Sequence, residues 1–207
     1  MKKAARHMIR IAAQLRALAS GSRQEIVDVL AELGTVSVAE LAATLGRPAD
    51  ALYFHLRRLI RAGLVEQAGH RSSGRRKEAL YRTIAPELML DYQPNNASHR
   101  AAITAIVTAM LRLGIRDFGR ALGRGDVITS GDHRELWALR RTGRLSMTQI
   151  AGVNRAIKRL NSSTTKHGGR GRLYAVTVLL TPLDRQRATL RPSNAQGQST
   201  KRYSRGK

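Results

Sequence analysis

Two short segments of helical periodicity, separated by a tight turn, constrain the fold of this chain most. Apolar residues recur at helical spacing between Ser37 and Gly46, and again between Pro48 and Gly63. Proline is well placed at the first position of a helix, because the backbone N–H that it lacks needs no partner there. Two short helices joined by a turn that contains glycine predict a helix-turn-helix.

The starts and ends of these helices are marked in the sequence. Ser37 is followed three residues later by Glu40, and Ser22 by Glu25. Each pair predicts a capping box, in which hydroxyl and carboxylate bond the free backbone donors of the first turn. Gly34 is predicted to end the helix that follows Ser22. The predicted buried stripe of the helix after Pro48 is Leu52, Leu56, Leu59 and Ile60.

A predicted β-hairpin follows these helices directly. Residues 64–68 and 78–84 have the composition of strands, and the intervening residues 70–77 are polar and strongly basic. A hairpin directly after a recognition helix is a wing. We therefore expect a winged helix-turn-helix from about Ser20 to Pro86.

The sequence of this segment resembles a known family. Residues 53–65, Tyr-Phe-His-Leu-Arg-Arg-Leu-Ile-Arg-Ala-Gly-Leu-Val, resemble the recognition helix and first wing strand of the ArsR-like winged-helix regulators. Residues 17–23 resemble the entry helix of that superfamily. The resemblance covers about residues 14–88 and implies a homodimeric DNA-binding repressor or activator. The metal-sensing members carry cysteine where this chain has residues 38–44, so their sensing chemistry is not expected here.

The charge of the chain indicates a polyanionic partner. The 207 residues include 37 Lys and Arg but only 14 Asp and Glu, which gives a formal net charge of +23. Basic side chains that neutralise phosphates release counterions and so drive binding to nucleic acid. A membrane surface or an acidic protein is the alternative partner.

Other classes of protein are disfavoured by what the sequence lacks. It contains no cysteine, which excludes disulfides and thiolate metal sites and fits a cytoplasmic protein. No paired carboxylates, histidine cluster or phosphate-binding loop stands at catalytic spacing, so we expect neither an enzyme nor a cofactor or metal site. The apolar stretches are too short to span a bilayer.

Candidate DNA contacts lie opposite the buried stripe of the recognition helix and in the wing. Residues near the start of that helix are predicted to contact bases in the major groove, where Arg57 suits guanine and Asp50 suits cytosine. Phe54 has an alternative place in the core or against the wing. His55 is expected to pack rather than to contact DNA, and Arg61 is a contact or only a solvated charge. The predicted set is Asp50, Tyr53, Phe54 and Arg57 for bases, Arg47 and Arg58 for phosphates, and Arg71, Arg75, Arg76 and Lys77 in the wing.

A long amphipathic helix is predicted after the turn-rich residues 93–96. It has about twenty residues, hence a length of about 30 Å. We expect it to pair with a second copy of the chain; packing within its own chain is the alternative. The predicted dimerisation residues are Ile103, Ile106, Val107, Met110, Leu111 and Phe118.

The rest of the chain has weaker patterns. We expect a loop over residues 119–131, then a short helix capped by Asp132 and Glu135. Trp137 is a candidate for a ligand pocket, although a core position is commoner. Residues 184–207 are predicted to be disordered and to add non-specific DNA affinity. The other predicted elements are a helix with a capping box at Ser146 and Gln149, a loop over 161–172 and a strand over 173–180.

Together these patterns predict an α+β, mainly α protein. Residues 1–90 form a winged helix-turn-helix domain, 91–98 a linker, 99–183 a helical dimerisation domain with a terminal strand, and 184–207 a basic tail. The predicted function is sequence-specific binding of double-stranded DNA and regulation of transcription, with an unknown small-molecule effector as a further candidate partner. The alternative is a basic architectural or RNA-associated protein that uses the winged helix as a scaffold.

Overall fold

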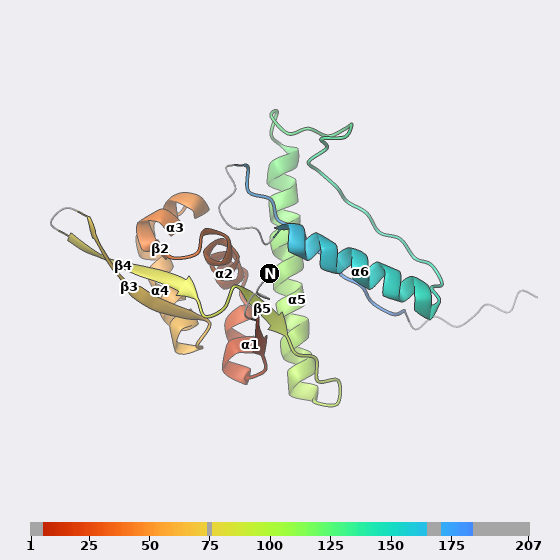
Figure 1. The fold of residues 1–207 in the computed structure, drawn as a ribbon, viewed down its shortest axis with the longest axis horizontal. Coiled ribbons are helices and arrows are strands. Elements are labelled where there is room, and N and C mark those ends of the chain that lie inside the picture. The colour runs from red at the N-terminus through yellow and green to blue at the C-terminus, as the bar shows by residue number, and fades with distance from the viewer. Residues whose placement is uncertain (1–5, 74–75, 165–170, 184–207) are drawn as a thin grey trace, which may run out of the picture.

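The computed structural model describes residues 6–73, 76–164 and 171–183. The fold is mixed α+β and mainly helical, with an N-terminal winged helix-turn-helix (Figure 1). The four helices of this domain are α1 (Ala12–Leu18), α2 (Gly21–Leu33), α3 (Val38–Leu45) and α4 (Ala49–Arg61). Its three-stranded antiparallel sheet has the order β2 (Val36–Ser37), β4 (Arg76–Thr83) and β3 (Val65–Ser73).

The ends of α3 follow the predicted chemistry. The Ser37 hydroxyl accepts from the Glu40 amide and the Glu40 carboxylate accepts from the Ser37 amide, which confirms the capping box. Gly46 ends α3 in the left-handed conformation, which glycine adopts without steric cost. The predicted box at Ser22 and Glu25 is wrong. Helix α2 begins before Ser22, and the carboxylate of Glu25 pairs with arginines instead.

The core of the domain is built from the apolar faces of α1 to α4. Leu52, Leu56 and Leu59 of α4 are almost completely buried, as predicted. Ile60 was predicted in the same stripe but is 37% exposed, so that assignment is wrong. Burial of the three leucines fixes which face of α4 is left for solvent.

The wing is more regular than predicted. Strands β3 and β4 pair from Val65 with Thr83 out to Ser73 with Arg76, with an irregularity between Gln67 and Gly69. The predicted polar tip is therefore mostly paired strand, and the hairpin extends away from the helices (Figure 1).

A second, two-stranded sheet was not predicted. Strand β1 (Arg6–Ile9) pairs in parallel with β5 (Glu87–Leu90), which follows the wing. Ile9 is buried in the common core, and Leu90 packs against that core. The start of the described chain is thus fastened to the segment that leads into the next helix.

Helix α5 (Ala97–Leu122) is one continuous rod that lies across the winged helix-turn-helix (Figure 1). It has 26 residues and continues through Gly119, so the first residues of the predicted loop over 119–131 are helical. Ile106 belongs to the buried core and Ile103 packs against it. Leu113 lies so close to Gly21 of α2 that a Cβ added there would be 3.3 Å from the leucine Cγ. One face of α5 therefore packs within its own chain.

The capping box at Ser146 and Gln149 is present and opens α6 (Met147–Thr164). This helix extends into the predicted loop over 161–172, whose residues 165–170 lie outside the described residues. Residues 173–180 form no strand within the described chain, and their side chains are exposed. A strand needs a neighbour for its backbone bonds, and the described residues supply none to this segment.

The segment between α5 and α6 also departs from prediction. No helix forms at Asp132, and the carboxylate of Glu135 instead accepts from the Ile128 amide and from Arg172. Trp137 is 67% exposed, so it lines no core and no enclosed pocket. The predicted tail at 184–207 lies outside the described residues. None of the described helices is both long and apolar enough to cross a membrane.

Candidate nucleic-acid interface

The solvent face of α4 carries the four residues predicted to contact bases. Asp50, Tyr53, Phe54 and Arg57 are all exposed, Tyr53 to 43% and Phe54 to 52%. Within the described chain, neither Asp50 nor Arg57 forms an ion pair. The arrangement leaves an acceptor, a guanidinium and two rings on one helix face, and these groups can bond or touch base edges.

Phe54 has its partners on the same helix. Its ring stands edge-on to the His55 ring at a centroid distance of 5.5 Å, and the guanidinium of Arg58 lies 5.3 Å from its centroid. A core position for Phe54 is thereby excluded. His55 is half-buried, and desolvation, followed by the charges of Arg23 and Arg47, lowers its pKa. This favours the packing role predicted for His55.

Arg47 stands in the turn before α4 but points to a carboxylate of its own chain. Its Nη2 atom lies 2.5 Å from Glu25 Oε2, and the side chain is 28% exposed. Arg116 of α5 lies 2.6 Å from the other oxygen of Glu25. The structure thus gives Arg47 an ion-pair partner that its sequence position did not reveal, and its predicted contact with phosphate stays a prediction.

The wing shows a similar division. Arg71 lies 3.0 Å from Glu40 and 3.2 Å from Glu78, and the hydrogen bonds to these two carboxylates raise its pKa. Lys77 is exposed and has no ion-pair partner in the described part of the chain. Arg75 and the side chain of Arg76 lie outside what the structure describes. In the described part of the wing, Lys77 is therefore a free cation, whereas the charge of Arg71 is largely compensated by Glu40 and Glu78.

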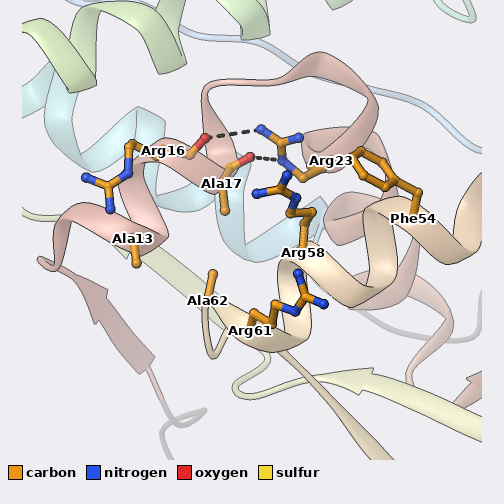
Figure 2. Close-up of a pocket in the computed structure, with 8 residues that line it drawn as sticks. All are labelled: Ala13, Arg16, Ala17, Arg23, Phe54, Arg58, Arg61 and Ala62. Carbon is orange, nitrogen blue, oxygen red and sulfur yellow. Dashed lines mark hydrogen bonds between the residues drawn. The ribbon is translucent and has the colours of Figure 1, made fainter.

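A basic groove beside α4 was not predicted. It has a volume of about 450 Å³ and lies between α1, the first turn of α2 and the later turns of α4 (Figure 2). Arg58 was predicted to contact phosphate, but its proximity to arginines of α1 and α2 was not predicted. Its residues, here called the arginine groove, are Ala13, Arg16, Ala17, Arg23, Phe54, Arg58, Arg61 and Ala62.

A larger cleft of about 660 Å³ lies on another side of the domain, between α2, α5, β5 and residues 173–177. It combines apolar side chains such as Leu88 and Met110 with the carboxylates of Glu25, Asp28 and Asp117. Asp28 keeps contact with solvent in the cleft. Desolvation by the protein around it, with the charges of Glu25 and Asp117, raises its pKa to about 6.

The residues predicted for dimerisation lie on two faces of α5. Ile106 is 5% exposed and belongs to the core, so its side chain packs within its own chain and is not available to a second copy. Leu111 is 39% exposed and, like Val107 and Phe118, faces away from Ile106 by helical spacing. Ile115 and Leu122, which were not predicted, extend this outer stripe and are 73% and 63% exposed.

The helices described above include a segment that matches a known protein family. Residues 18–68 match the family model of a helix-turn-helix domain. The matched segment spans α2, α3, α4 and the start of β3, which is the frame that presents the exposed face of α4. The match supports a DNA-binding regulator of helix-turn-helix type, and it specifies no subfamily.

Two solved structures resemble the chain weakly. One is ZitR from Lactococcus lactis, a C30AH42A mutant in apo form, at 13% identity over 72% of this chain and 86% of that one, with a TM-score of 0.29. The other is Rv1404 from Mycobacterium tuberculosis, at 16% identity over 77% of this chain and 86% of that one, also with a TM-score of 0.29. No curated protein matches the chain. Likenesses at this level add nothing to the assignment of function.

Proposed function

We propose that this protein is a sequence-specific, double-stranded DNA-binding regulator of transcription that acts as a homodimer. The observation that carries the proposal is the exposed face of α4. It holds Asp50, Tyr53, Phe54 and Arg57 above a fully buried leucine stripe, and neither of its two charged residues is paired within the described chain. A surface that served only to bind phosphate would have no use for the aspartate that stands at the start of this face.

In the proposed complex, the first turns of α4 enter the major groove. Arg57 bonds guanine, Asp50 accepts from cytosine, and the rings of Tyr53 and Phe54 contact thymine methyl groups. The wing lies on the backbone or in the minor groove, where Lys77 supplies a free charge. The proposal keeps the domain boundaries that were predicted from the sequence, at residues 90, 98 and 183.

The test of this function is the ratio of specific to non-specific affinity. The preferred duplex is first selected from random DNA with the full-length chain. Its affinity is then compared with that of a scrambled duplex, and of an RNA of equal length, at two salt concentrations. We expect the selected duplex to bind about a thousandfold more tightly or better. A ratio near one would overturn the proposal and favour an architectural role, and preference for RNA would favour an RNA-associated one.

Dimerisation is proposed through the outer stripe of α5. Its residues are spaced four, four, three and four apart, which places them on one side of the helix, opposite Ile106. Three of these side chains are exposed and two are partly buried, and an apolar row of this kind is typical of a helix that pairs with a second copy. The stripe comprises Val107, Leu111, Ile115, Phe118 and Leu122.

Replacing Ile115 with aspartate is therefore expected to convert the dimer to a monomer. A charge at the centre of an apolar interface would have to be desolvated without a partner. Sedimentation measures the result, since the wild type should have about twice the 22.8 kDa mass of the chain. Ala105→Asp adds the same charge to an exposed position off the stripe and should remain dimeric. A monomeric wild type, or an unchanged I115D dimer, would contradict this interface.

A further inference from the structure

The arginine groove gathers four guanidinium groups from three helices. Arg58 and Arg61 come from α4, one turn apart, Arg16 lies in the last turn of α1, and Arg23 lies in the first turn of α2 (Figure 2). Phe54 stands one turn before Arg58 and belongs both to the groove and to the face of α4 proposed to contact bases. The groove is therefore continuous with the recognition surface.

Arg23 is fixed in place by the backbone. Its Nε donates to the carbonyl of Ala17 at 2.5 Å, and its Nη2 donates to the carbonyl of Arg16 at 3.2 Å (Figure 2). These two bonds use two of the five N–H donors of a guanidinium, so donors remain for a ligand. A side chain held in this way loses little entropy when it binds.

The charges in the groove are not compensated by the protein. Among the described residues, no carboxylate pairs with Arg16, Arg23, Arg58 or Arg61. Desolvation lowers the pKa of Arg23, and the nearby charge of Arg58 lowers it further. Like charges held together destabilise one another, and an anion placed among them removes that repulsion.

We propose that the arginine groove is a phosphate-binding site that holds the DNA backbone beside the bases contacted by α4. A guanidinium group binds phosphate through two parallel N–H bonds, and arginines line both sides of the groove. Phe54 and Arg58 lie one helical turn apart, so the proposed base contact and the proposed phosphate contact are adjacent on α4. The site therefore fixes the register of α4 on the duplex. The proposal extends the DNA-binding function above and rests on it.

The test uses the double variant Arg16→Ala, Arg61→Ala, because both side chains are exposed and neither makes a described hydrogen bond. Affinity for the selected duplex is measured against salt concentration. Each lost phosphate contact is expected to reduce the slope of log K against log salt by about 0.9. We expect the slope to fall by about one to two for selected and scrambled duplexes alike, with the ratio of their affinities kept.

A matched control is Arg140→Ala, Arg141→Ala, which removes the same charge from an exposed segment outside the winged helix. It should leave the slope close to that of the wild type. An equal fall in both variants would overturn the proposal, since it would reflect net charge alone. An unchanged slope in the groove variant, with specific binding intact, would overturn the groove and leave the proposed function standing.

Pyrophosphate separates the two sources of a phosphate ligand. It is titrated into the wild type and the groove variant without DNA, and the NMR signals of the Arg23 side chain and the His55 ring are followed. Weak binding that disappears in the variant, together with the slope change, supports a backbone site. Tight pyrophosphate binding with no slope change would overturn the assignment to DNA and identify a site for a free anion. A wild type that binds no duplex would overturn the proposed function, and the titration would still show whether the groove binds phosphate.

Discussion

Replacing Leu56 with alanine is expected to lower the free energy of unfolding by about 2–5 kcal/mol. The leucine is 1% exposed and lies in the middle of α4, with Leu52 one turn before it and Leu59 about one turn after it. Alanine leaves a cavity and removes apolar contacts without weakening the helix itself, since its helix propensity is high. Urea unfolding followed by circular dichroism measures the change, and a loss under about 1 kcal/mol would contradict the packing described for α4.

Ile60 is the matched control for Leu56. It lies one turn later on α4 and has the same number of carbon atoms, but it is 37% exposed. Ile60→Ala should cost clearly less than Leu56→Ala. Equal losses would mean that the sequence pattern, which placed both residues in the core, describes the helix better than the structure does.

Replacing Arg57 with alanine is expected to reduce affinity for the selected duplex by about 1–3 kcal/mol, which is about 5- to 150-fold. The guanidinium is exposed on α4 and has no ion-pair partner among the described residues, so its removal should not destabilise the fold. Affinity for scrambled duplexes should change far less, because a base contact contributes little to non-specific binding. Fluorescence anisotropy with both duplexes measures the difference.

Lys77→Ala provides the contrast to Arg57→Ala. Its ammonium group lies on the wing and should contact backbone phosphate, so the substitution should weaken all duplexes alike and keep their ratio. If R57A also lowered both affinities equally, Arg57 would be a phosphate contact, and the proposed orientation of α4 would be wrong.

The N-terminal domain could be predicted because its elements are specified locally. Ser37 and Glu40 bond backbone groups three residues away, and Leu52, Leu56 and Leu59 recur at helical spacing. Such patterns need no knowledge of distant contacts. The one residue that was misplaced in the stripe, Ile60, lies at its edge, where periodicity cannot separate buried from half-exposed positions.

The features that escaped prediction depend on residues far apart in the chain. Strands β1 and β5 pair Arg6 with Glu87, and no local pattern in either segment indicates the other. The arginine groove likewise needs the packing of α1 against α4 before its charges meet. After α5, the strand expected at 173–180 is apolar enough to be one, but the described chain gives it no neighbour.

The shared carboxylate of Glu25 connects the turn before the recognition helix to α5. One oxygen holds Arg47, directly before the recognition helix, and the other holds Arg116 on α5. A change in the tilt of α5 therefore has to stretch an ion pair, or carry the start of α4 with it. In a dimer joined through α5, the separation of the two recognition helices would thus be set partly by this triad, and with it the spacing of half-sites that the protein can span.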